Sequence, residues 1–159
     1  VGAFEDCSTA LISQSMMEAT RQRIEQGTWF LGICVGYQIL FDHSEEFQSN
    51  SPGFGHFKGP VVRFPEKPGL KVPQIGWNQV KYIQPDCPIF KDIPDNSHFY
   101  FVHSYHPKPE DTSIIAGETE YEIPFASAVW HDRVFATQFH PEKSQSVGLQ
   151  LLKNFVDLI

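Results

Sequence analysis

The sequence has few cysteines and no long hydrophobic run, and both absences exclude classes of protein. Three cysteines in 159 residues, Cys7, Cys34 and Cys87, do not form a disulfide framework, and none has the C-x-x-C spacing of a zinc site. Such sparse, odd cysteine usage is typical of the reducing cytoplasm, where we expect the protein. No apolar stretch approaches the length of a transmembrane helix.

The sequence also lacks a run of basic residues. Its net charge is −7, which argues against nucleic acid or an anionic membrane as the partner. It contains no internal repeat and no low-complexity tract. Apolar residues make up 41% of a chain that is long enough for one domain with a substantial core.

The segment Gly32-Ile33-Cys34-Val35-Gly36 places a thiol where a strand is predicted to become a helix. Residues 28–31 form a short apolar run typical of a buried strand, and residues 37–41 have helical spacing. We predict a nucleophile elbow, whose flanking glycines prevent a Cβ from colliding with the neighbouring helix or strand. The helix that begins at Val35 is expected to favour the Cys34 thiolate. The alternative is an ordinary cysteine packed in a core.

A second motif follows the predicted strand over residues 134–139. His140 lies where this strand stops, because Pro141 lacks an N–H and directs the chain out of the sheet. Glu142, two residues on, can accept the imidazole N–H and fix the tautomer. Because carboxyl ends of parallel strands share one edge of a sheet, we expect Cys34 and His140 to meet there. The alternative is a surface histidine beside a solvated glutamate.

The order of the remaining segments predicts an α/β protein with an inserted antiparallel section. A doubly wound sheet usually begins with a βαβ unit of about 30 residues, whereas this sequence begins in a predicted loop. We therefore expect either that a segment of about this length precedes Val1 or that the sheet has fewer strands than a doubly wound sheet. The expected elements are a loop over 1–6, a helix over 8–26 ended by Gly27, a polar surface loop over 44–58, strands over 61–64, 79–83, 99–104, 113–117, 126–130 and 134–139, and a final helix over 144–158.

These motifs resemble the class I glutamine amidotransferases, a family with a Cys-His-Glu triad on a flavodoxin-like, mostly parallel sheet flanked by helices. Within the family, the sequence is most similar to glutaminase subunits of imidazole glycerol phosphate synthase, which act in histidine biosynthesis. The resemblance covers essentially the whole chain, so we expect residues 1–159 to form a single domain. The segments that carry it are 1–4, 32–38, 72–78, 101–105, 138–145, 148–149 and 152–155.

The resemblance implies a role for each matching residue. Cys34 would attack the side-chain amide of glutamine and form a glutamyl thioester, His140 would transfer the protons, and Glu142 would orient His140. Backbone N–H groups of Val35 and of the Val1-Gly2 strand would stabilise the oxyanion. Gln38, Ser104 and Tyr105 would contact glutamine, and Trp77 and Lys143 would contact a partner. The alternatives are a solvated Gln38 and ordinary strand-end polarity at Ser104 and Tyr105. For Trp77, the alternative is burial in this domain's own core.

The family's partner is a (β/α)₈-barrel cyclase, in a heterodimer. Ammonia would pass through the barrel and react with a phosphoribulosyl-formimino aminoimidazole-carboxamide ribonucleotide, giving imidazole glycerol phosphate and aminoimidazole carboxamide ribonucleotide. We expect no cofactor and no metal, because His98, His103 and His106 lie among aromatic residues without acidic neighbours.

Three alternatives remain open. One is a glutaminase subunit that serves pyridoxal phosphate or anthranilate synthesis. The second is a stand-alone cysteine hydrolase acting on γ-glutamyl peptides. The third is a catalytically silent fragment that only binds the cyclase.

Overall fold

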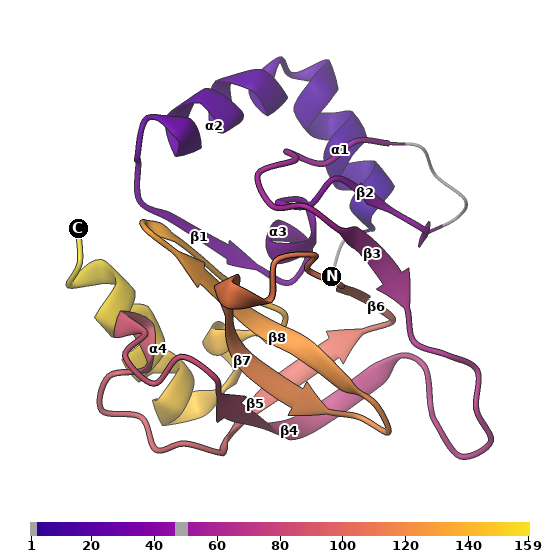
Figure 1. The fold of residues 1–159 in the computed structure, drawn as a ribbon, viewed down its shortest axis with the longest axis vertical. Coiled ribbons are helices and arrows are strands. Elements are labelled where there is room, and N and C mark those ends of the chain that lie inside the picture. The colour runs from indigo at the N-terminus through magenta and orange to yellow at the C-terminus, as the bar shows by residue number, and fades with distance from the viewer. Residues whose placement is uncertain (1–2, 47–50) are drawn as a thin grey trace.

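The computed structural model describes residues 3–46 and 51–159, and it contains two sheets (Figure 1). The larger sheet has the strand order β1-β9-β8-β7-β4-β5, and the smaller has the order β2-β3-β6. The helices are α1 (Phe4–Ser13), α2 (Met16–Glu25), α3 (Val35–Gln38) and α4 (Gln145–Val156); the strands are β1 (Phe30–Ile33), β2 (His43–Ser44), β3 (Pro60–Arg63), β4 (Gln74–Tyr82), β5 (Ser97–His103), β6 (Tyr105–Pro107), β7 (Ile115–Glu120), β8 (Pro124–His131) and β9 (Val134–Thr137); short 3₁₀ turns occupy Pro88–Phe90, Thr112–Ile114 and Pro141–Lys143.

The larger sheet is mixed, so the expectation of a mostly parallel sheet is wrong for the described strands. Only β1 and β9 run parallel in it, and all its other neighbouring strands are antiparallel. The reason is the length of the connections, because β7, β8 and β9 follow one another through turns of two or three residues. A parallel pair needs a crossover of a dozen or more residues, which these turns cannot provide.

Helices cover both faces of the sheet. Along β9, Val134 and Ala136 pack in the apolar cluster that includes residues of α1 and α2, whereas Phe135 packs in the cluster that includes Leu151 of α4. This alternation follows from the two-residue period of a strand. The α/β class predicted from the sequence is therefore confirmed, with helix layers on opposite sides of the sheet (Figure 1).

The predicted helix over 8–26 is two helices. α1 begins at Phe4, so the predicted loop is wrong for Phe4–Asp6. Between α1 and α2, Ser15 has a φ of 58°, a left-handed conformation that interrupts the helical hydrogen bonds. The predicted stop at Gly27 is confirmed, because Gly27 has a φ of +78° directly after the end of α2.

The predicted surface loop over 44–58 is partly buried. Gly53, Phe54 and Phe57 are buried, and the Phe54 N–H donates to the Ile39 carbonyl at 2.6 Å. A Cβ at Gly53 would lie 1.9 Å from the Phe41 carbonyl oxygen, so the backbones touch there.

The predicted strands and final helix are present, with shifted ends. β4 shows the largest shift, because it begins at Gln74 rather than at residue 79. Within the part of the chain that the structure describes, no helix is long and apolar enough to cross a membrane.

Candidate active site

Cys34 lies at the corner between β1 and α3, as the elbow motif predicts. Its φ and ψ are 52° and −107°, a strained backbone for a residue with a side chain, and such strain is often found at functional sites. The Cys34 N–H donates to the Thr137 carbonyl at 2.8 Å, which ties the corner to β9. A Cβ at Gly32 would lie 2.4 Å from the Gly36 carbonyl oxygen, whereas a Cβ at Gly36 would meet nothing within 4 Å. The steric requirement is therefore confirmed for Gly32 and wrong for Gly36.

The Cys34 thiol is buried, and this burial acts against the predicted thiolate. Burial raises the pKa of Cys34 above its ordinary value, although a hydrogen bond from the Val35 N–H acts in the opposite direction. The helix that follows has only four residues, so its dipole is too short to outweigh the desolvation of the sulfur. A thiol of this kind needs a nearby base to be deprotonated when it attacks.

His140 and Glu142 form the pair that their spacing predicts. The Nδ1 of His140 lies 2.6 Å from the Glu142 carboxylate, which therefore accepts the Nδ1–H and leaves the lone pair of the neutral ring on Nε2. His140 is 7% exposed, and its Nε2 has no hydrogen-bond partner among the described residues. A buried ring nitrogen without a partner is free to exchange a proton with a neighbouring group.

The strand register brings the thiol and the imidazole to the same edge of the sheet. Ile33 pairs with Thr137 in the parallel ladder of β1 and β9, so Cys34 and His140 both follow the carboxyl ends of adjacent strands. The charge of Glu142 raises the pKa of Cys34 and that of Lys143 lowers it, which places this turn within electrostatic reach of the sulfur.

The turn that carries His140 is held in place by Ser144. The Ser144 hydroxyl donates to the His140 carbonyl at 2.6 Å and accepts the Tyr100 N–H at 2.9 Å, so it links the turn to β5. Helix α4 packs directly on the same turn, because a Cβ at Gly148 would lie 1.9 Å from the Pro141 carbonyl oxygen. The histidine therefore stands on a rigid support, which accurate proton transfer requires.

A pocket of about 180 Å³ adjoins the thiol. This volume is below the range of roughly 300–1,000 Å³ typical of drug-sized ligands, and it suits a molecule of amino-acid size. The predicted substrate residues all line it. Glu46 lines it as well, and sequence reasoning missed it because nothing in the polar segment around it indicates that it lies in the same pocket as Cys34. The lining residues are Cys34, Gln38, Glu46, Pro73, Val102, His103, Ser104 and Tyr105.

Gln38 is buried rather than solvated, and its amide nitrogen is already engaged. The Nε2 of Gln38 donates to the Tyr105 carbonyl at 3.0 Å and to the Gln138 side-chain oxygen at 3.2 Å. The Nε2 of Gln138 in turn lies 3.8 Å from the Cys34 sulfur. Gln138 was also missed, because its position inside the predicted strand indicated only packing.

The three histidines considered for a metal do not point into one site. His98 is exposed, while His103 and His106 are buried and each directs its Nδ1 at a backbone carbonyl oxygen. Burial lowers the pKa of His103 to about 3, so its imidazole is neutral at physiological pH. His103 therefore acts as a neutral, buried wall of the pocket.

The expected partner residues lie beside the histidine turn. Trp77 is 47% exposed, with its ring edge against Tyr100, and Lys143 is exposed on the turn itself. The alternative of a Trp77 buried in this domain's own core is therefore wrong. A cavity of about 390 Å³ contains Trp77 together with the residues that follow Lys143. The expected oxyanion residues Val1 and Gly2 lie outside the described residues.

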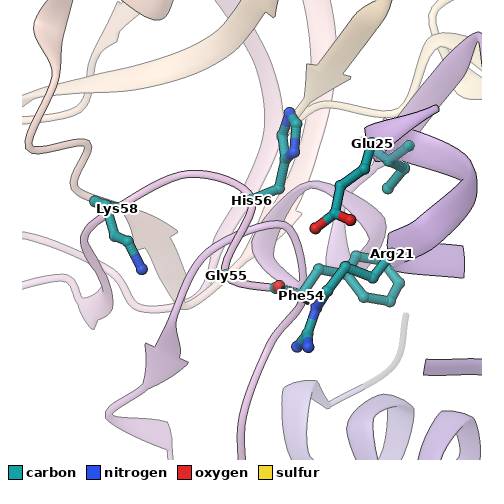
Figure 2. A pocket seen from close by; sticks show the side chains of 7 residues that line it. Arg21, Glu25, Phe54, Gly55, His56 and Lys58 are labelled. Atoms are coloured by element: carbon teal, nitrogen blue, oxygen red, sulfur yellow. Dashed lines mark hydrogen bonds between the residues drawn. The ribbon is translucent and has the colours of Figure 1, made fainter. Parts of the chain in front are cut away.

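A third cavity, of about 330 Å³, lies against α2 on a different part of the molecule (Figure 2). It contains two cations, but each is already paired with a carboxylate: Arg21 with Glu18 at 3.2 Å, and Lys58 with Asp42 at 2.9 Å. Among the described residues that line it there is no thiol and no hydroxyl nucleophile. The cavity at Cys34 is therefore the better candidate for a site of chemistry. The third cavity is lined by Arg21, Ile24, Glu25, Phe54, Gly55, His56 and Lys58.

Comparisons with known proteins agree with this geometry. The family model for class-I glutamine amidotransferase matches residues 2–158. The chain is 49% identical to "Imidazole glycerol phosphate synthase subunit HisH" of Syntrophotalea carbinolica, over 99% of this chain and 78% of that protein. The protein of the same name from Neisseria meningitidis serogroup B is 49% identical, over 98% of this chain and 74% of that protein.

Two solved structures share the fold of this chain. A crystal structure of a glutamine amidotransferase superposes with a TM-score of 0.71 at 16% identity, over 99% of this chain and 75% of that one. PurLQS from Thermotoga maritima superposes with a TM-score of 0.67 at 15% identity, over 90% of this chain and 68% of that one. At such identities the likeness shows the fold alone.

Proposed function

Because the chain belongs to the class I glutamine amidotransferases and, within them, to the HisH subunits of imidazole glycerol phosphate synthase, we propose that it hydrolyses glutamine at Cys34. One observation above all supports this proposal. The parallel register of β1 and β9 leaves Cys34 and the His140–Glu142 pair at one edge of the sheet, and Cys34 lines a pocket of amino-acid size. The products are glutamate and ammonia, and residues 1–159 act as a single glutamine amidotransferase domain.

The reaction uses the catalytic triad in two steps. The Cys34 sulfur attacks the side-chain amide carbon while His140 Nε2 takes the thiol proton, and the C–N bond then breaks as that proton passes to the departing ammonia. Water attacks the resulting thioester, giving its proton to His140, and glutamate leaves as the thiol is restored. Glu142 keeps the Nδ1–H in place and stabilises the imidazolium.

The oxyanion of each tetrahedral intermediate needs N–H donors. We assign one to the backbone N–H of Val35, the residue directly after the nucleophile. We assign the second donor to the Val1-Gly2 segment. A single donor of this kind is worth about 100- to 1,000-fold in rate.

The pocket residues recognise the amino acid. Glu46 carries the charge that matches an α-ammonium group, and the carbonyl-rich and hydroxyl-bearing rim at Ser104 and Tyr105 supplies further polar contacts. Gln38 contributes through its side-chain oxygen, because both of its amide hydrogens are engaged within the protein.

The ammonia goes to a (β/α)₈-barrel cyclase with which the chain forms a heterodimer in the cytoplasm. Ile75 and Trp77 are exposed apolar side chains on one face of β4, and Trp77 shares a cavity with the residues that follow the exposed Lys143. These three residues form the proposed docking face. Docking at this edge keeps the released ammonia away from water, where it would be protonated. The cyclase uses the ammonia to make imidazole glycerol phosphate and aminoimidazole carboxamide ribonucleotide.

Coexpression with different acceptor enzymes tests this function. We expect glutaminase turnover, measured as glutamate released, to rise when the chain is combined with the cyclase subunit of a HisH-containing synthase. Acceptor subunits from pyridoxal phosphate or anthranilate synthesis are expected to leave it unchanged. Full turnover of the chain alone would instead support a stand-alone hydrolase, and binding to the cyclase without turnover would support a silent binding protein.

Replacing Glu142 with glutamine is expected to lower kcat by only about 10-fold. The side chain of Glu142 is 46% exposed, so the new amide can turn its oxygen toward His140 Nδ1 and preserve the tautomer. The loss is then the difference between a charged and a neutral acceptor, about 1.4 kcal/mol. Glutamate release by Glu142→Gln and Glu142→Ala measures this, and we expect Glu142→Ala to be clearly the slower enzyme. Equal activity of the two variants would contradict the role of this hydrogen bond.

A further inference from the structure

A chain of buried amides connects the pocket to the sulfur. It runs from the Tyr105 carbonyl to Gln38, then to Gln138, and ends at Cys34. Gln138 has no exposed surface, and its backbone is fixed by the N–H that donates to the Ser127 carbonyl at 2.8 Å. The triad described above makes no use of this side chain.

The hydrogen bonds determine which end of each amide faces which neighbour. The Tyr105 carbonyl oxygen can only accept, so the Gln38 group 3.0 Å from it must be the NH₂. The same NH₂ lies 3.2 Å from the Gln138 side chain, so that contact must be made by the Gln138 oxygen. The opposite end of the Gln138 amide, which faces the sulfur at 3.8 Å, is therefore its NH₂.

We propose that Gln138 donates an N–H to the Cys34 sulfur and stabilises its thiolate, and that Gln38 is the positioning residue that holds the Gln138 amide in this orientation. The proposal deepens the proposed function, since it rests on Cys34 as the nucleophile. It also connects the thiolate with the substrate pocket, because Gln38 and Tyr105 line that pocket.

The surroundings of the sulfur explain why such a donor matters. Burial raises the pKa of Cys34, and the negative charge of Glu142 raises it further, while Glu46 lines the same pocket. Lys143 on the histidine turn acts in the opposite direction. His103 is neutral. In the proposed reaction, His140 accepts the proton that the Cys34 thiol loses. The donors that favour the thiolate directly are the Val35 N–H and, in this proposal, the Gln138 amide.

Alkylation of Cys34 by iodoacetamide as a function of pH tests the proposal without requiring glutamine hydrolysis. A hydrogen bond to an ionised sulfur is worth a shift of about one pKa unit. Gln138→Met keeps the size and removes the donor, so we expect the apparent pKa of Cys34 to rise by about one unit and alkylation at pH 7 to slow about 10-fold. Mass spectrometry resolves Cys34 from the other two cysteines.

Gln38→Met separates orientation from simple packing. Its side chain does not touch the sulfur, but without it the Gln138 amide can turn its oxygen toward Cys34, so the apparent pKa is expected to rise here as well. In the double variant the shift should not exceed that of Gln138→Met alone, because the two residues act through one hydrogen bond. This variant carries the test even where Gln138→Met fails to fold.

Gln84→Met is the matched control, since Gln84 also donates twice to backbone carbonyls but lies outside the pocket. In this variant we expect the pH dependence of Cys34 alkylation to match that of the unmodified protein. An unchanged pKa in Gln38→Met, or additive shifts in the double variant, would overturn the proposal. Glutamate release, measured separately, shows whether the glutaminase assignment itself fails, because the thiol titration does not depend on it.

Discussion

Replacing Cys34 with alanine is expected to lower glutaminase kcat about a million-fold, and His140→Ala is expected to cost about as much. Triad residues that act as a unit lose nearly all of their catalysis when either the nucleophile or the base is removed. For the same reason the double variant should be no slower than either single variant. Glutamate release, measured in the complex with the cyclase, gives the three rates.

The fold should tolerate these changes. Cys34 has a φ of 52°, which alanine adopts about as well as cysteine, and Cys34→Ala removes only one sulfur atom from a buried corner. His140 has a φ of −101°, an extended conformation that alanine adopts without strain. Cys87→Ala is the matched control, because Cys87 is also a buried free cysteine but lies in the cluster under α4. It should leave kcat unchanged. A further large loss in the double variant, or a mild effect of either single one, would contradict a shared triad.

The location of the site could be predicted from the sequence because its signals are local. Gly32 allows β1 and α3 to approach closely, and Pro141 restricts the backbone directly after His140; the resulting corner and turn are present. That the two motifs lie at one sheet edge follows from the parallel pairing of adjacent strands, a general rule.

The properties that were not predicted depend on contacts between distant segments. The pKa of Cys34 follows from how deeply the corner is buried and from a helix that ends after four residues. The place of Glu46 in the pocket depends on a loop whose neighbours lie on other elements, and Phe4 N–H donates to its carboxylate at 2.8 Å. The position of Gln138 depends on Gln38, far away in the sequence. Residue type alone cannot specify such neighbours.

The two glycines beside Cys34 are expected to respond in opposite ways to the same substitution. In Gly32→Ala the new Cβ would lie 2.4 Å from the Gly36 carbonyl oxygen and 3.1 Å from the Tyr37 nitrogen, all of it rigid backbone. Helix α3 must therefore move away from β1 and take Cys34 with it. A displacement of about 1 Å costs about 100-fold in rate, and overpacking costs roughly 1–3 kcal/mol of stability.

Gly36→Ala tests the same helix with the steric conflict removed. Its Cβ would meet nothing within 4 Å, and alanine is favoured over glycine inside a helix by about 1 kcal/mol. We therefore expect its melting temperature to be equal or slightly higher and its glutaminase rate to stay within a few-fold of the unmodified protein, while Gly32→Ala loses about 5 °C and most of its activity. Thermal unfolding and glutamate release measure both variants. If the two lost activity equally, the elbow would require glycine for a reason other than the contact between β1 and α3.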